Sequence, residues 1–336
     1  VNASRMPSPG DASEMLGRAM ERWDEAVADV AAAAVARHAD TASVFDVFSA
    51  LGARDFRSIG HKAIYVMCAR RTLNAVGWEF AEPVLRSLAY ALLMHEDGNP
   101  ATREDEADRP WRRNQRIVGS VRETWNEGAP NAEATAELLT VLHGGSNDDA
   151  VDALVAMLNR GVAPTSIWDS LFCGAAELQL RLPNIVSLHA VTTTRAIHDA
   201  YHATRDPRTK LLLMMQNAAF LPMFRDGARN RGDMSDTTIS GLQAASPQGS
   251  DERAVADCVT DLDGQRGRAA ERILGYLQSG RPVKPLRQRL YELVAFKGND
   301  AHDFKFASAA LECYDYISPE YRNRYLACGA MHFCGS

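Results

Sequence analysis

Signals of β-structure are nearly absent from the sequence. It contains no run of alternating β-branched residues and no Asn-Gly hairpin turn. It also contains no stretch of about 18 apolar residues, so we expect no membrane-spanning helix. Basic runs are missing as well, and 37 basic against 43 acidic side chains leave a net charge of −6. Such an acidic chain is a poor partner for nucleic acid or for anionic membrane surfaces.

Several familiar active-site signatures are missing too. The chain has no GxGxxG, no GxxxxGK[ST], no GxSxG and no EF-hand loop. Dinucleotide binding, phosphoryl transfer by a P-loop and α/β-hydrolase chemistry are therefore not expected. The duplicated ExxH pairs of di-iron helical bundles do not appear either.

Cysteine is present, but without the spacing of a redox or zinc site. None of the six cysteines forms a CxxC pair, and several lie in apolar, helix-like runs. We therefore expect buried free thiols in a reducing compartment, which indicates a cytoplasmic protein. The first residues show no basic segment followed by an apolar run, so no signal peptide is expected.

Helical periodicity dominates what is present, and it predicts an all-α protein. We expect one large domain over 1–336, an irregular bundle of packed helical hairpins that could divide near 225–250. The polar segment 99–110 is expected to be an exposed loop, and 225–250 a long loop that covers a site as a lid. The expected helices are 13–36, 60–76, 83–95, 111–126, 132–143, 147–160, 165–182, 185–204, 208–224, 251–278, 283–297, 301–317 and 319–330.

Histidines on apolar helical faces are the first candidates for chemistry, because a buried imidazole needs partners for both ring nitrogens. His61 lies in line with Tyr65 and Cys68 on one helical face, so it is expected to point inward. Its partner could be a metal ion or a backbone carbonyl. His189 follows an apolar run and is expected to point inward too. The threonines at 192–194 could bind a substrate oxygen or bond back to helix carbonyls.

Other histidines give weaker signals. His143 ends an apolar helix, where it could oppose the helix dipole or act as a ligand. His198 and His202 are four residues apart and can reach one metal from the same helical face. However, HxxxH without the glutamate of HExxH is a weak signal, and the polar neighbours of His202 predict a surface position.

Lys305 is the unusual residue near the C-terminus. It lies between Phe304 and Phe306, three residues after His302 and on the same helical face, in a chain with only five lysines. A buried lysine can lose its proton, and the neutral amine can take up carbon dioxide to give a carbamate, an anionic oxygen ligand. The alternative is an ordinary lysine whose ammonium group reaches solvent along the surface.

Three segments resemble the questin oxidase-like family in their order and spacing. SIGHKAIYVMCARRTLNAVGWEFAEPVLRSLAYALL resembles the helical His segment of that family, SLHAVTTTRAI its His-Val-Thr segment, and DAHDFKFASAAL its Asp-x-His-x-x-Lys segment. Members of the family are helical oxygenases that act on polycyclic aromatic polyketides. Some are similar to non-haem iron dioxygenases whose metal is held by several histidines and a carboxylated lysine.

The resemblance implies a metal-dependent oxidoreductase that uses O₂ on an aromatic phenol or quinone. Fe(II) is the expected metal, with other first-row metals as alternatives, because imidazoles suit several of them and one anionic oxygen favours redox-active iron. Tyr65, Thr192 and Thr193 would be the groups nearest the substrate. The implied ligands are His61, His189, His302 and Lys305, completed by His143 or, in competition with it, His198.

Two other classes of function remain open. A helical interaction scaffold of HEAT-like type would leave these histidines scattered, each bonded to backbone or water, whereas the oxygenase requires its ligands to converge. A zinc hydrolase would need a carboxylate near the histidines, and Asp199 or Asp300 could provide it.

Overall fold

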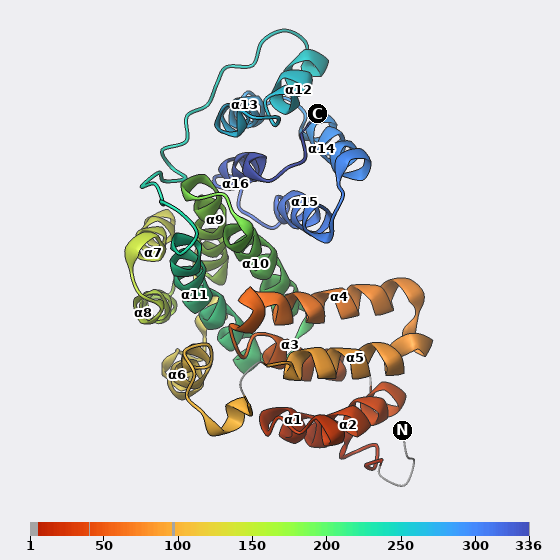
Figure 1. The fold of residues 1–336 in the computed structure, drawn as a ribbon. Helices are drawn as coiled ribbons and strands as arrows, with labels where there is room; N and C mark the ends of the chain where they lie inside the picture. Colours follow the sequence, from red (N-terminus) through yellow and green to blue (C-terminus); the bar gives the residue numbers. More distant parts are fainter. Residues whose placement is uncertain (1–5, 40, 96–97, 336) are drawn as a thin grey trace. The chain divides into compact units, whose positions relative to one another are not determined.

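The computed structural model describes residues 6–39, 41–95 and 98–335 of the chain. Over these ranges it is all-helical, with sixteen α-helices and several short 3-10 turns (Figure 1). The only strand-like contact in them is an isolated bridge between Ala129 and Val162. The predicted fold class is therefore confirmed. None of the described helices is long and apolar enough to cross a membrane.

The chain forms two compact units. Unit 1 consists of residues 1–121 and 196–219, and unit 2 consists of residues 122–195 and 220–336. The chain passes from one unit to the other between Val121 and Arg122, within α10 (Ile185–Ala203) and within α11 (Pro207–Arg229). Residues 230–250 do form an irregular segment, between α11 and α12 (Asp251–Thr260).

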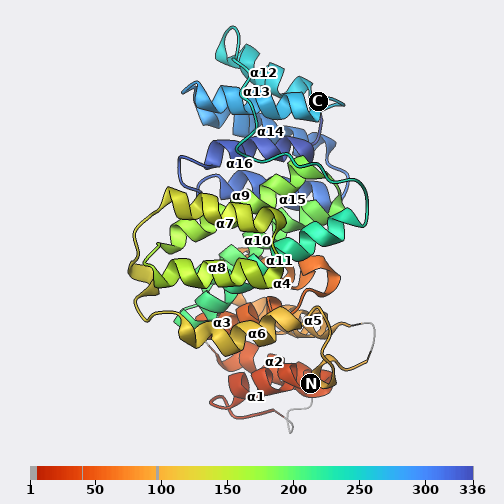
Figure 2. The same cartoon turned by 90° about the vertical axis from the view of Figure 1, so that its left-hand side faces the viewer.

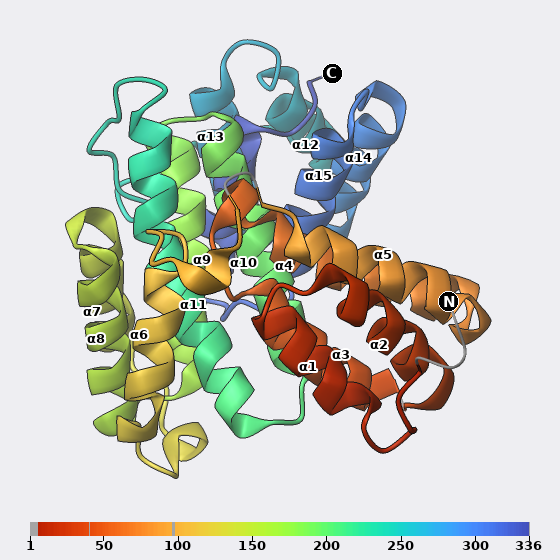
Figure 3. The same cartoon turned by 60° about the horizontal axis from the view of Figure 1, so that its bottom comes forward.

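Unit 1 is a group of amphipathic helices around an apolar core. Helix α2 packs against α1 and α5, and α4 packs against α3 and α5 (Figure 3). The core contains large apolar side chains from several of these helices, among them Leu16, Phe45, Phe48 and Leu85. The helices of this unit are α1 (Ala12–Glu21), α2 (Glu25–His38), α3 (Thr41–Gly52), α4 (His61–Val76), α5 (Ala81–Leu93) and α6 (Arg109–Ile117).

The start of unit 1 differs from the sequence prediction. The single helix expected over 13–36 is two helices, because Trp23 adopts a left-handed backbone conformation with φ 55°. The side chain of Asp24 then accepts the backbone N–H of Val27 and caps the new helix. Helix α3 was not predicted, whereas the expected segments 60–76 and 83–95 correspond to α4 and α5.

Unit 2 is arranged around α9, whose side chains are almost all buried. Helix α7 packs against α8 and α9, and α16 packs against α9 and α13 (Figure 2). The helix expected over 251–278 is divided into α12 and α13 near Gly264, which has φ 95°. The remaining bounds in this unit are α7 (Ala132–Gly144), α8 (Asn147–Asn159), α9 (Pro164–Arg181), α13 (Arg266–Gln278), α14 (Val283–Lys297), α15 (Ala301–Cys313) and α16 (Arg322–Cys328).

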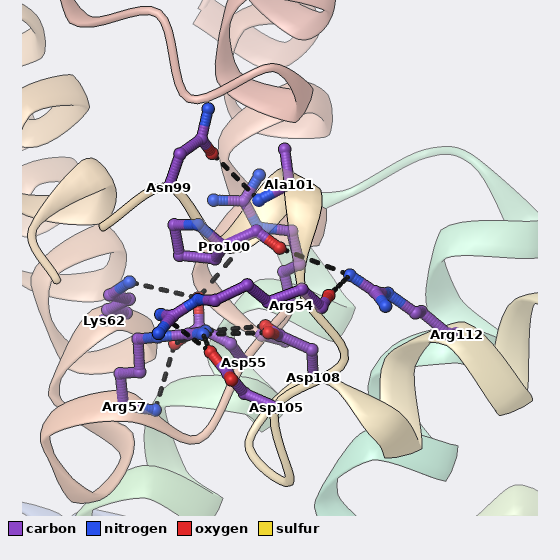
Figure 4. A network of polar contacts seen from close by, with 12 residues as sticks. Arg54, Asp55, Arg57, Lys62, Asn99, Pro100, Ala101, Asp105, Asp108 and Arg112 are labelled. Carbon is purple, nitrogen blue, oxygen red and sulfur yellow. Dashed lines mark hydrogen bonds and ion pairs between the residues drawn. The ribbon is translucent and has the colours of Figure 1, made fainter. Parts of the chain in front are cut away.

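A buried ion pair lies at the turn between α3 and α4 in unit 1. The Lys62 ammonium is 3.0 Å from the Asp55 carboxylate, and the two side chains are only 1% and 0% exposed. The ammonium also lies 4.7 Å from the centre of the Trp23 ring. Burial lowers the pKa of Lys62 to about 8, while the charge of Asp55 opposes this shift. Figure 4 shows Lys62 and Arg57 next to Asp55.

Arg57 extends this network to the segment that precedes α6. Its guanidinium donates hydrogen bonds to Asp108 at 2.6 Å and to Asp105 at 2.8 Å. The guanidinium of Arg54 covers the Trp23 ring, 4.1 Å from its centre. The segment 99–110, expected to be an exposed loop, is therefore held by ion pairs, and Asp108 is buried.

We expect Asp55→Asn to destabilise the protein more than Lys62→Met. The first change leaves a buried ammonium without its carboxylate, which typically costs about 3–5 kcal/mol. The second leaves Asp55 with Arg57, 3.6 Å away, so its cost should be smaller. Urea unfolding of the full chain measures both. Arg18→Ala, which removes an exposed ion pair with Glu14, should change nothing measurable, and equal losses in the two core variants would contradict this assignment.

The lowered pKa of Lys62 predicts a pH dependence of stability. Between pH about 8, the pKa of Lys62 in the folded protein, and 10.5, the ordinary pKa of a lysine, the unfolded chain binds a proton that the folded chain does not. The free energy of unfolding should therefore rise with pH across this window relative to Lys62→Met, by up to about 3 kcal/mol. Parallel stability curves for the wild type and Lys62→Met would show that Lys62 does not titrate in this way.

Candidate metal-ligating residues

The part of α10 that belongs to unit 2 carries buried polar side chains. His189 is fully buried, and so are Thr193 and, at 2% exposure, Thr192. The Nδ1 atom of His189 lies 2.6 Å from the carbonyl oxygen of Ile185, one helical turn earlier. Because a carbonyl can only accept, Nδ1 carries the proton and Nε2 carries a lone pair. This is the tautomer in which a histidine binds a metal through Nε2.

Lys305 of α15 lies next to the lone pair on His189 Nε2. Its Nζ atom lies 2.8 Å from His189 Nε2, and the two residues are 116 positions apart in the sequence. Since Nε2 accepts, the lysine nitrogen is the donor. The side chain of Lys305 is half-buried. Two residues that the resemblance names as ligands are thus in direct contact.

His302 lies beside them, one turn before Lys305 on α15. Its ring centre is 5.3 Å from that of His189. Asp300 caps α15 and accepts the backbone N–H groups of His302 and Asp303. These bonds, led by the one from His302, lower the pKa of Asp300. The anionic carboxylate also lies 3.4 Å from His302 Nδ1, which leaves Nε2 of that ring as the ligand atom.

His61 is the first residue of α4 in unit 1, and a left-handed turn leads into it. Ser58, Ile59 and Gly60 have φ values of 54°, 49° and 80°. The left-handed region is costly for a serine and more so for a β-branched isoleucine, so this turn stores strain. The buried Asp55–Lys62 pair spans the same turn.

This turn gives His61 the same tautomer as His189. Its Nδ1 atom lies 2.5 Å from the carbonyl oxygen of Ser58, so the lone pair is on Nε2. The ring of Tyr65 stacks on the imidazole, with the ring centres 5.9 Å apart. Each of His61, His189 and His302 can therefore offer one ring nitrogen to a metal ion. Such nitrogen donors suit first-row transition metals and not calcium or magnesium.

The threonine nearest to His189, Thr192, contacts carbonyl oxygens of its own helix. The hydroxyl of Thr192 lies 3.5 Å from the carbonyl oxygen of Leu188 and 3.4 Å from that of His189. This is the arrangement in which a threonine bonds back to helix carbonyls. Its role toward a substrate, like that of Thr193 and Tyr65, stays a prediction.

His198 and His202 form a pair of their own in the unit 1 part of α10. Their Nε2 atoms are 3.1 Å apart, a distance at which one proton is shared between the rings. His198 is buried, and His202 is exposed as expected. Asp199 accepts two hydrogen bonds from Arg70, at 3.0 and 2.5 Å. Asp199, one of the two carboxylates considered for a zinc hydrolase, is thus engaged by a guanidinium.

His143 ends α7 and has a carboxylate partner. Its Nδ1 atom lies 2.6 Å from an oxygen of Glu177, a buried residue of α9. It lines a cavity in unit 2 whose walls include none of His189, His302 and Lys305. The structure therefore places His143 in a different environment from the cluster around His189.

No protein-family model, curated protein or solved structure matches the chain. The resemblance to the questin oxidase-like family therefore stays a prediction. The case for a metal site depends on the side chains themselves, on their tautomers and on the oxygens behind them.

Glu177 is the functional candidate that sequence reasoning missed. It lies 34 residues from His143, on another helix, and no local pattern links the two. Asp300 carried a usable signal, because an aspartate directly before a helical run predicts an N-cap. Its second contact, with the ring of His302, was not evident from that pattern.

We expect Ser58→Gly to stabilise the protein by about 0.5–1 kcal/mol, because glycine adopts the left-handed conformation without steric cost. Ser58 is exposed, so the change removes little packing. The urea midpoint measures the effect. Gly60→Ala is the opposite change in the same turn. It adds a Cβ atom to a residue with a φ of 80°, so it should lower the urea midpoint. A lower midpoint for Ser58→Gly would show that the turn is not strained.

Proposed function

We propose that the protein is a non-haem metal-dependent oxygenase, with Fe(II) as its metal, that acts on an aromatic phenol or quinone with O₂. The observation that carries the proposal is the contact of Lys305 with the lone pair of buried His189, with His302 beside it. The order and spacing of the three segments that resemble the questin oxidase-like family support the same reading.

Lys305 explains how an anionic oxygen ligand could arise beside the imidazoles of His189 and His302. The lone pair of His189 faces Lys305, whose Nζ atom lies 2.8 Å away. Loss of the proton from Lys305 gives an amine whose nitrogen can bond to carbon dioxide and release a proton. The product is a carbamate with an anionic oxygen. Neutral imidazoles with one anionic oxygen form the donor set that favours a redox-active first-row metal.

His189, His302 and Lys305 would hold the metal in unit 2, and the sequence resemblance adds His61. The bond from His61 Nδ1 to the Ser58 carbonyl agrees with that role. The metal would supply the binding and activation of O₂. We leave His143 out of the set because it lines a cavity whose walls include none of His189, His302 and Lys305. We leave His198 out because its Nε2 atom faces that of His202. Tyr65, Thr192 and Thr193 remain the proposed substrate-side groups.

We also propose a cytoplasmic location. All six cysteines are free thiols, as expected in a reducing compartment. Burial raises the pKa of both Cys258 and Cys313 to about 12, so these two thiols stay protonated and unreactive.

The proposal predicts near-stoichiometric iron in protein made with ample iron. His189→Ala and Lys305→Ala should each weaken metal retention by roughly 10–100-fold, which elemental analysis after dialysis measures. His38→Ala and Lys297→Ala, two exposed positions, are matched controls that should keep the metal. His61→Ala tests the ligand that comes from the resemblance. With ¹³C-labelled bicarbonate, a carbamate resonance should appear in the wild type and vanish in Lys305→Ala.

Other outcomes would favour the other classes of function. Stoichiometric zinc, or a metal that Lys305→Ala retains, would favour a hydrolase. Protein without metal, together with unchanged folding of both variants, would favour a scaffold. Iron that depends on both residues would justify an O₂-uptake assay with phenols and quinones.

A further inference from the structure

Unit 2 contains a cavity of about 470 Å³ that is separate in its lining from the His189 cluster. Its walls come from α7, α9, the residues around α16 and the irregular segment 230–250. This segment is held in place, because Arg324 donates hydrogen bonds to the carbonyl oxygens of Ile239 and Leu242. The segment expected to be a lid thus forms part of the wall of a cavity.

A histidine and a buried glutamate face each other at this cavity. His143 Nδ1 lies 2.6 Å from one oxygen of Glu177, and the backbone N–H of Ile239 donates to the other oxygen at 2.8 Å. The side chain of Glu177 is 7% exposed, whereas that of His143 is 26% exposed. Both side chains line the cavity, and the imidazole is the more exposed of the two.

The chemistry of this pair favours proton uptake at one atom. With Nδ1–H donated to Glu177, the lone pair of His143 is on Nε2, for which the described residues provide no protein partner. A proton added there gives an imidazolium that Glu177 stabilises. The C-terminal end of α7, where His143 lies in the last turn, stabilises the same cation through the helix dipole.

The rest of the lining restricts the ligand. Ala136, Leu139 and Cys173 give an apolar surface, and burial raises the pKa of the Cys173 thiol so far that it stays protonated. The lining carries the carboxylates of Glu177 and Glu320 and the guanidinium of Arg324, which donates to backbone carbonyl oxygens. While His143 is neutral the lining is therefore net negative, which disfavours a ligand that is already anionic. A neutral aromatic body with one weakly acidic hydroxyl satisfies both conditions.

We propose that this cavity binds a neutral phenol and that the His143–Glu177 pair takes up its proton. The phenol O–H bond breaks and an N–H bond forms at His143 Nε2, which gives a phenolate next to an imidazolium. The proton on Nδ1 stays with His143. This inference depends on the cavity and the pair alone, so it holds whether or not the metal proposal does.

The test uses 4-nitrophenol and its methyl ether, 4-nitroanisole, on chelator-treated full-length protein. The two have nearly the same shape, but only the phenol can give up a proton. At a pH below the pKa of the free dye, bound nitrophenol should show the yellow nitrophenolate band. It should bind about tenfold or more tightly than nitroanisole, as expected for a charge-assisted hydrogen bond. Equal affinities for the two compounds, or no binding, would overturn the proposal.

Variants locate the site. His143→Gln should abolish the nitrophenolate band and equalise the two affinities, whereas His38→Gln, at an exposed position, should change neither. Ala136→Phe should fill the cavity and weaken both compounds together, and because Ala136 is exposed at the rim this variant should fold. A band that persists in His143→Gln, or tight binding by Ala136→Phe, would contradict the assignment. His189→Ala should lose metal but bind nitrophenol unchanged, which separates this test from that of the oxygenase.

Discussion

The turn between α3 and α4 depends on one buried ion pair, Asp55 with Lys62. A lysine ammonium removed from water is stable only while a carboxylate accompanies it, so the connection after α3 is tied at Asp55 to the first turn of α4. The pair holds three left-handed residues in place, and these bring the Ser58 carbonyl to His61 Nδ1. Because Lys62 directly follows His61 in the sequence, the Asp55–Lys62 ion pair also positions His61. The ion pair thereby fixes the tautomer of His61, a proposed metal ligand.

The pattern of apolar residues was sufficient for most helices, because burial of one face every 3.6 residues is a local property. Helix breaks were harder to predict. The chain leaves helical geometry at Trp23 and again near Gly264, each inside a run whose periodicity continues across the break. At the first break, the usable sequence signal was Asp24, whose side chain caps the helix that follows. Periodicity records which residues face inward, but it does not show where the backbone changes direction between two helices that share a core.

Contacts between residues that are close in the sequence could be predicted, whereas contacts between distant residues could not. The spacing of His302 and Lys305 places them on one helical face, and Asp300 follows from helix capping. The contact between Lys305 and His189 joins residues 116 positions apart, so the sequence could suggest it only through a resemblance. The pairing of His143 with Glu177 had no such support. Tertiary partners of this kind follow from packing, which a single sequence does not reveal.

The group that contacts Nδ1 fixes the tautomer of each histidine and so leaves the lone pair on Nε2. A backbone carbonyl, as behind His189 and His61, fixes the tautomer without adding charge, so the imidazole is a neutral ligand through Nε2. A carboxylate, as behind His143 and at a longer distance behind His302, fixes the same tautomer and in addition favours positive charge on the ring or on a metal that the ring binds. The surroundings of Nε2 then separate these histidines. Nε2 of His189 faces Lys305, whereas His143 lines a cavity that neither His189 nor Lys305 reaches.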